Sequence, residues 1–278
     1  PSAFTQGGWN VSPLISTRSR QAGGGDDFAE SGAVGMLDIV AALRWVQDNI
    51  AQFGGDPGRV LLFGQSGGGA KTSMALGMPS AKGLIHRAGV MSGSLLRAME
   101  REAADLAAMR VLKALDVAPG DLRGLQQLPY AHILQVQALV EADDRAKGLP
   151  PMALAPVVGG SAIPAHPFDP AAPATSHDFP MIVSTALDEW TFRMVDFDIS
   201  QADVRAYAHK RVGANADALL DYYIQETPGI SPFIQKARIE TDLGFRRGAF
   251  AQAERKAAAG GAPVWTYLWT QPSPAAAA

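Results

Sequence analysis

The chain contains no cysteine, and this absence excludes several kinds of protein chemistry before any motif is considered. None of its 278 residues can form a disulfide, bind zinc through a thiolate or act as a cysteine nucleophile. The chain also has no large excess of one charge, because it contains 24 Lys and Arg residues and 27 Asp and Glu residues, for a formal net charge of −3. With no run of basic residues, we expect no nucleic-acid partner.

Long apolar runs are also missing from the sequence. No stretch approaches the roughly 18 uninterrupted apolar residues that a membrane-spanning helix needs. Hydrophobic residues nevertheless make up 47% of the chain and charged residues 18%, a balance typical of a globular domain with a sizeable core. We therefore expect no membrane span, and partners that are small and uncharged.

Both ends of the sequence are unusual. The chain opens with Pro1 and not with methionine, and its last residues, 275–278, are four alanines. We expect a sequence that is incomplete at both ends. Residues 1–32 carry glycine clusters without a sustained hydrophobic period, and we expect irregular surface chain there.

Short apolar runs alternate with helical patterns over the rest of the chain. Strands are expected at Val60–Phe63, Ala88–Met91, Met181–Thr185 and Val264–Trp269. Helices are expected from Val34 to the glycines at 54–55, from Ser66 to Leu76, at Ala98–Leu115, at Pro129–Val140, from Ser200 to Val212, at Ala214–Gln225, and from Ser231 to the glycines at 260–261. This alternation predicts an α/β fold with a mostly parallel sheet, which we take as a single domain, 1–278, with a helical insertion at 98–149.

Two of these elements carry expectations about burial. The first helix should bury a stripe formed by Val34, Leu37, Ala41, Trp45 and Phe53. The four apolar residues at 60–63, bounded by glycines, should form a strand that is buried on both faces.

A chemical motif, GQSGG, occupies residues 64–68 between an expected strand and an expected helix. This context is typical of a nucleophile elbow, in which a tight turn requires small residues around a serine whose hydroxyl stands clear of the sheet. Here the serine is Ser66, and the N–H of Gly67 would face a developing oxyanion. A glycine-rich turn that only packs, or that cradles a phosphate, is the alternative, although the Walker lysine pattern is absent.

Several separate blocks around this motif resemble the type-B carboxylesterase family, which is cholinesterase-like. The blocks are Gly35-Met36-Leu37-Asp38, Leu43-Arg44-Trp45-Val46, Asn49-Ile50, residues 53–57 (FGGDP), residues 64–68, His86 to Ser94, Pro156-Val157-Val158, Pro164 to Asp169, Asp188-Glu189 and Val264 to Trp269. The likeness covers roughly residues 33–270 and suggests a bacterial source. It implies an α/β-hydrolase fold with catalytic residues in the chain order Ser, Glu, His.

The resemblance implies a serine esterase that acts on uncharged carboxylic esters through an acyl-serine intermediate, with no metal and no cofactor. Ser66 would be the nucleophile, Gly67 an oxyanion donor, and Glu189 the acid that orients the histidine. Asp188 is the competing candidate for this acid. Without the resemblance, Glu189 would be interpreted as an ordinary solvent-exposed carboxylate in a loop. Ser92 would support the acid through hydrogen bonds, and Gln65 would support the elbow.

An apolar pocket for the substrate is expected as well. Its candidate residues are Met152, Leu154, Trp190 and Phe192, each of which could equally belong to the hydrophobic core.

Two parts of the catalytic machinery are not found in the sequence. The chain has five histidines, and none follows the last expected strand, where the family places its base. Ahead of residue 33 the sequence offers only Gln6-Gly7-Gly8-Trp9 in place of the family's glycine turn. The favoured hypothesis is an incomplete view of an active esterase, because Ser66 and Glu189 are retained. The alternative is a truncated, non-catalytic homologue that binds apolar esters or a protein partner.

Overall fold

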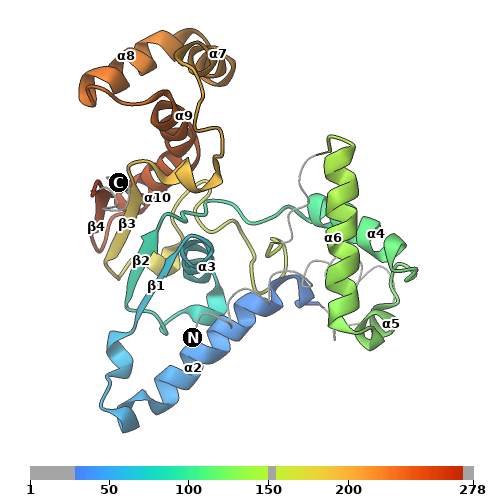
Figure 1. Ribbon diagram of the computed structural model, residues 1–278. Helices are drawn as coiled ribbons and strands as arrows, with labels where there is room; N and C mark the ends of the chain where they lie inside the picture. Colours follow the sequence, from blue (N-terminus) through green and yellow to red (C-terminus); the bar gives the residue numbers. More distant parts are fainter. Residues whose placement is uncertain (1–28, 150–154, 272–278) are drawn as a thin grey trace.

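Four parallel strands form the centre of the computed structural model, which describes residues 29–149 and 155–271 (Figure 1). The strands are β1 (Leu61–Gln65), β2 (Arg87–Met91), β3 (Met181–Ala186) and β4 (Val264–Trp269). They lie in the order β1-β2-β3-β4, and every neighbouring pair is parallel. The predicted parallel sheet is therefore confirmed, and each strand lies within two residues of its predicted position.

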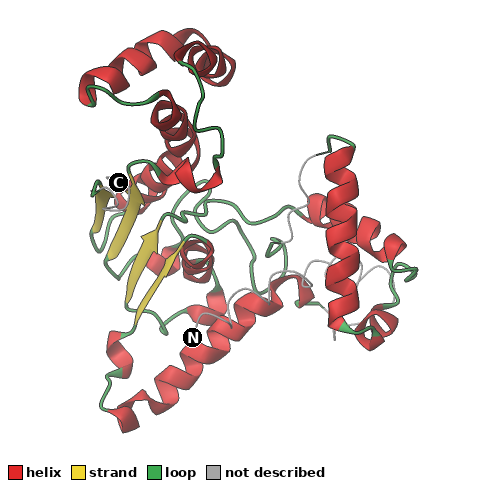
Figure 2. Cartoon of the chain, in the orientation of Figure 1, coloured by secondary structure: helices red, strands yellow, loops and turns green. Residues whose placement is uncertain are grey.

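Helices connect the strands and extend beyond them (Figure 2). They are α2 (Val34–Asn49), α3 (Gly67–Leu76), α4 (Arg101–Ala114), α5 (Leu122–Gln127), α6 (Tyr130–Ala146), α7 (Gln201–Val212), α8 (Ala216–Glu226), α9 (Pro232–Thr241) and α10 (Arg247–Ala258). A π-helix, Asp242–Arg246, joins α9 to α10, so the predicted single helix up to the glycines at 260–261 is interrupted. Short 3₁₀ turns lie at Ser31–Ala33, Ile50–Phe53, Pro57–Arg59, Pro79–Ala81, Ala174–Ser176, Glu189–Arg193 and Gly213–Asn215.

Helix starts follow the capping residues of the sequence. The hydroxyl of Ser200 accepts from the N–H of Asp203, whose carboxylate in turn accepts from the Ser200 N–H, so α7 begins with a capping box. Ser231 caps α9 in the same position, with Pro232 as the first helical residue. Both helices thus begin at the serines from which the sequence predicts them.

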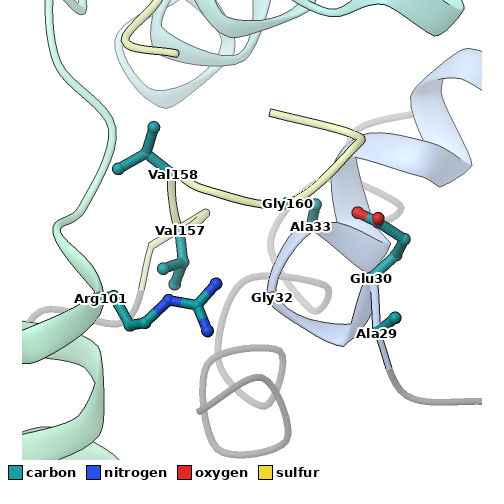
Figure 3. Close-up of a pocket in the computed structure, with 8 residues that line it drawn as sticks. All are labelled: Ala29, Glu30, Gly32, Ala33, Arg101, Val157, Val158 and Gly160. Carbon is teal, nitrogen blue, oxygen red and sulfur yellow. The ribbon is translucent and has the colours of Figure 1, made fainter. Parts of the chain in front are cut away.

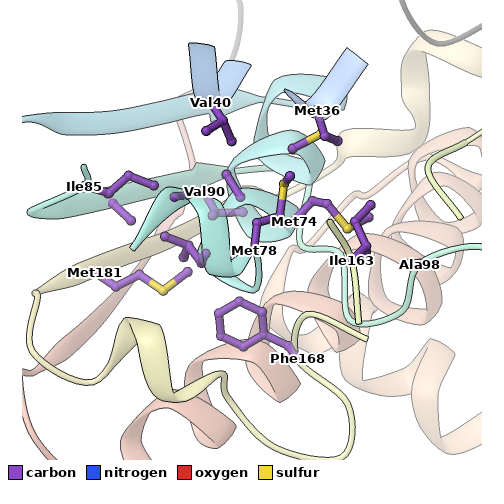
Figure 4. Packing of buried hydrophobic residues seen from close by; sticks show 14 of the residues in the cluster. Met36, Val40, Met74, Met78, Ile85, Val90, Ala98, Ile163, Phe168 and Met181 are labelled. Atoms are coloured by element: carbon purple, nitrogen blue, oxygen red, sulfur yellow. The ribbon is translucent and has the colours of Figure 1, made fainter. Parts of the chain in front are cut away.

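The first helix buries a different face from the one we predicted. Met36, Val40 and Leu43 are buried in the sheet core, whereas Val34, Trp45 and Phe53 are exposed. Within α2 the predicted stripe and the buried residues both recur every three or four positions, because the helix is apolar on more than one side. Figure 4 shows Met36 and Val40 packing toward the strands. Contact with α3 and the sheet therefore selects the face, and the predicted stripe was wrong except at Leu37, which is partly buried against the same core.

The sheet is covered unequally on its two faces. Ala88, Val90, Met181 and Val183 face α2, α3 and α10 and are buried. On the other face the strand register aligns Phe63, Gly89, Ile182 and Trp265 in one row. The side chains of this row are 63% exposed at Phe63, 44% at Ile182 and 54% at Trp265, and no helix among the described residues packs over them.

This asymmetry overturns the prediction that the strand at 60–63 is buried on both faces. Leu61 and Phe63 are exposed, and Leu62 is half-buried. In the described part of the chain β1 is an edge strand that pairs with β2 alone, so an apolar run marked the strand correctly without fixing its surroundings.

Within residues 29–149 and 155–271, buried hydrophobic side chains gather in three clusters. The largest lies between the sheet and α2, α3 and α10 (Figure 4). A second joins α4, α5 and α6, which stand apart from the sheet in Figure 1, and a third joins α7, α8 and α9. The expected insertion at 98–149 thus has helices with a core of their own, while the assignment of 1–278 to one domain stays a prediction.

No helix of the described segments is long and apolar enough to cross a membrane.

Candidate active site

Ser66 occupies a strained turn between β1 and α3. Its backbone has φ 54° and ψ −120°, a conformation that residues with a side chain rarely adopt. The Ser66 N–H donates to the carbonyl of Met91 at 2.8 Å, and α3 begins at the next residue. Its side chain is exposed. This strand-turn-helix geometry is that of a nucleophile elbow.

Close backbone contacts explain only some of the glycines around Ser66. A Cβ on Gly64 would lie 2.3 Å from the backbone carbon of Gly68, and a Cβ on Gly93 would lie 2.0 Å from the carbonyl oxygen of Ser66. At Gly67 and Gly68 a Cβ would meet nothing within 4 Å. The expected need for small residues therefore holds at Gly64 and at the distant Gly93, but not at the two glycines after the serine.

Gly93→Ala should destabilise the fold strongly, whereas Gly68→Ala should not. The first change places a methyl group inside contact distance of the Ser66 carbonyl, so we expect a loss of about 3 kcal/mol or more in the free energy of unfolding. The second adds a methyl group in open space on a helix, where alanine is favoured by up to about 1 kcal/mol. Urea denaturation of both variants measures the difference, and equal stability would contradict the assigned packing.

Glu189 follows β3 and turns back toward the end of that strand. Its Oε1 accepts a hydrogen bond of 2.6 Å from the N–H of Ala186, and the residue is only partly buried. In a parallel sheet the loops after all strands meet at one edge. The turn at Ser66 after β1 and the loop carrying Glu189 after β3 therefore open at the same edge of the sheet, with Ser92 after β2 between them.

Asp188, the competing candidate for the catalytic acid, is held in an ion pair with Arg238. Its two carboxylate oxygens accept from Arg238, at 2.9 Å from Nε and 3.2 Å from Nη2. The Arg238 side chain is only 6% exposed, so this pair is part of the packed structure. The geometry therefore favours Glu189 over Asp188 as the carboxylate free to meet another group.

The two residues that were predicted to support the site lie at the ends of β1 and β2, and their supporting role stays a prediction. Gln65 is the exposed last residue of β1, beside Met91 of β2. Ser92 is buried at the end of β2 with φ 51°, and its N–H donates to Ser184 at 2.8 Å. Among the described residues no hydrogen bond joins the Ser92 hydroxyl to Glu189. The backbone bond to Ser184 connects Ser92 to β3, the strand that precedes Glu189.

The four pocket candidates are placed differently. Met152 and Leu154 lie outside the described residues. Trp190 is half-buried, with its ring centroid 5.8 Å from that of Phe245, and its assignment to the pocket or to the core stays a prediction. Phe192 is exposed, and the guanidinium of Arg193 lies 5.2 Å from its ring centroid.

None of the five histidines forms a hydrogen bond with Ser66 in the described structure. His86 accepts from the Val60 N–H at 3.2 Å, and His132 is exposed on α6. The other three contact carboxylates elsewhere: His166 with Glu100, His177 with Asp178 and His209 with Asp217. Within the described segments no three His, Asp or Glu side chains gather to hold a metal ion.

A small cavity lies away from these residues, at the start of α2. It has a volume of about 20 Å³, enough for one water molecule, and Figure 3 shows Arg101 and Glu30 at its walls. The Glu30 carboxylate accepts from the N–H groups of Ser161 and Ala162, both at 3.0 Å. Glu30 thus binds the loop at Ser161 and Ala162 to the 3₁₀ turn that precedes α2, a contact that the sequence did not predict.

Comparison with known proteins agrees with the resemblance seen in the sequence. A model of the carboxylesterase family matches residues 25–275. The chain is 30% identical over 252 residues to a para-nitrobenzyl esterase of Bacillus subtilis (strain 168), covering 86% of this chain and 47% of that protein. It is 31% identical over 248 residues to a phenmedipham hydrolase of Pseudarthrobacter oxydans, covering 87% and 48%. The chain spans about half the length of the curated relatives it matches.

Solved structures confirm the predicted α/β-hydrolase fold. A carboxylesterase of Geobacillus stearothermophilus superposes with a TM-score of 0.72 at 29% identity, over 96% of this chain and 53% of that one. A thermophilic PNB esterase superposes with a TM-score of 0.65 at 29% identity, over 84% of this chain and 47% of that one.

Proposed function

The chain belongs to the carboxylesterase family, and we propose that the full-length protein hydrolyses uncharged carboxylic esters with Ser66 as its nucleophile. The observation that carries the proposal is the strained turn at Ser66, whose exposed hydroxyl lies at the start of α3. Strain of this kind persists only where the surrounding structure imposes it, and it is concentrated at functional sites.

In the proposed reaction the Ser66 oxygen attacks the ester carbonyl, and the alcohol leaves to give an acyl-serine. The Gly67 N–H and the positive end of α3 stabilise the oxyanion. Glu189 orients the imidazole that takes the serine proton. Water then hydrolyses the acyl-serine, which releases the carboxylic acid and restores the Ser66 hydroxyl. Among the described residues no histidine forms a hydrogen bond with Ser66, so none of the five histidines is proposed as this imidazole.

A comparison of two substrates with one leaving group tests this function. The full-length protein should hydrolyse p-nitrophenyl butyrate with a turnover of about 1 s⁻¹ or more and leave p-nitrophenyl phosphate intact. The phosphate ester controls for reactions that depend only on the nitrophenolate leaving group. No hydrolysis of p-nitrophenyl esters from acetate to octanoate would contradict the proposal and favour the non-catalytic binding protein instead.

A further inference from the structure

The loop after β3 is held by side chains from a distant part of the chain. Arg246, the last residue of the π-helix, donates from Nη2 to the carbonyl of Leu187 at 2.8 Å and to that of Ala186 at 3.2 Å. These two peptide units form the turn that returns Glu189 to the N–H of Ala186. One guanidinium therefore fixes the turn on which the Glu189 carboxylate depends.

Arg246 is itself fixed by a second set of contacts. Its Nη1 pairs with Asp242, one turn earlier, and the other carboxylate oxygen of Asp242 accepts from the hydroxyl of Tyr223. Burial raises the pKa of the Tyr223 phenol well above its ordinary range, so this hydroxyl stays a donor. The Arg246 side chain is 15% exposed, and a partly desolvated ion pair of this kind holds one geometry better than a surface pair does.

Neighbouring residues of α9 hold the remaining positions of the loop. Arg238 binds Asp188, and the hydroxyl of Thr241 accepts from the N–H of Trp190 at 3.1 Å. Thr241 is fully buried. With both flanking residues held, Glu189 has its side chain directed back to Ala186.

From this arrangement we propose that Arg246 is a positioning residue for Glu189, a role that rests on the proposed function of Glu189 as the catalytic acid. Arg246 does not touch the substrate. It holds the carbonyls of Ala186 and Leu187, so that the Ala186 N–H meets Oε1 of Glu189 and the carboxylate keeps one direction at the edge of the sheet.

Amide hydrogen exchange at Ala186 tests the proposal without any need for turnover. In Arg246→Met, which keeps an unbranched apolar stem and removes the guanidinium donors, exchange at Ala186 should rise by about tenfold or more. Arg246→Lys keeps the charge but cannot reach two carbonyls in a fork, so its rise should be smaller. Exposed Arg247, the next residue, supplies the matched control, and Arg247→Met should stay within about twofold of the parent.

Glu189→Ala removes the acceptor and shows whether the bond from Ala186 controls this exchange, so exchange at Ala186 should rise in that variant too. A rise in Glu189→Ala without one in Arg246→Met would overturn the positioning role. So would an equal rise at Val183 and Ser184 of β3, because the whole strand would then be loosened. In the full-length esterase, Arg246→Met should lower kcat and leave KM within about twofold. Because the exchange is read independently of reaction at Ser66, failure of the proposed function would be seen separately.

Discussion

Ser66→Ala in the full-length protein should abolish hydrolysis of p-nitrophenyl butyrate, with a loss of about six orders of magnitude in kcat. The hydroxyl is the atom that forms the acyl bond, and no other group of the elbow can replace it. The fold should be unaffected, because the side chain is exposed and makes no capping hydrogen bond with α3. Steady-state kinetics and thermal unfolding of the same preparation measure both effects.

Ser66→Gly is a matched control for this variant. It removes the same hydroxyl, so activity should be lost to the same extent. It also relieves a positive φ of 54° at a residue with a side chain, and the free energy of unfolding should rise by about 1 kcal/mol. Activity retained in either variant would exclude Ser66 as the nucleophile, and a Ser66→Gly variant less stable than Ser66→Ala would contradict the strained turn.

Glu189→Gln should lose activity and keep its stability, whereas Asp188→Asn should lose stability and keep most of its activity. Glu189→Gln should lower kcat by about four orders of magnitude, because a neutral amide cannot stabilise an imidazolium. Its oxygen can still accept from Ala186, so thermal stability should change little. Asp188→Asn weakens the pair with buried Arg238, which should cost about 3 kcal/mol of stability and leave most of the activity.

Kinetics and urea denaturation of the two variants, measured side by side, check this separation. The larger kinetic loss in Asp188→Asn, with Glu189→Gln still active, would transfer the role of acid to Asp188. Equal losses of stability in both variants would contradict the different contacts of the two carboxylates in the structure.

Features set by local chemistry could be predicted from the sequence. The elbow at Ser66 follows from glycine spacing between a strand and a helix, and the caps at Ser200 and Ser231 follow from side chains that reach their own helix starts. The positions of the four strands could be predicted because short apolar runs between glycines or prolines are typical of strands in a parallel sheet.

Features that depend on distant neighbours could not be predicted in this way. The buried face of α2 is selected by α3 and the sheet, because Met36 is buried and Trp45 is exposed although both are apolar in the sequence. The exposure of Phe63 depends on what packs over β1. The contacts of Arg238 and Arg246 with the loop after β3 join residues at least 50 positions apart, and an arginine on a helix carries no signal of such a partner.

Mass spectrometry of the full-length protein after incubation with a fluorophosphonate tests the central claim most directly. An activated serine displaces fluoride and forms a covalent bond from its oxygen to phosphorus. We predict one adduct per chain, located at Ser66 by peptide mapping and absent from the Ser66→Ala variant. An unmodified protein, or an adduct at a residue other than Ser66, would contradict the assignment of this turn as the catalytic centre.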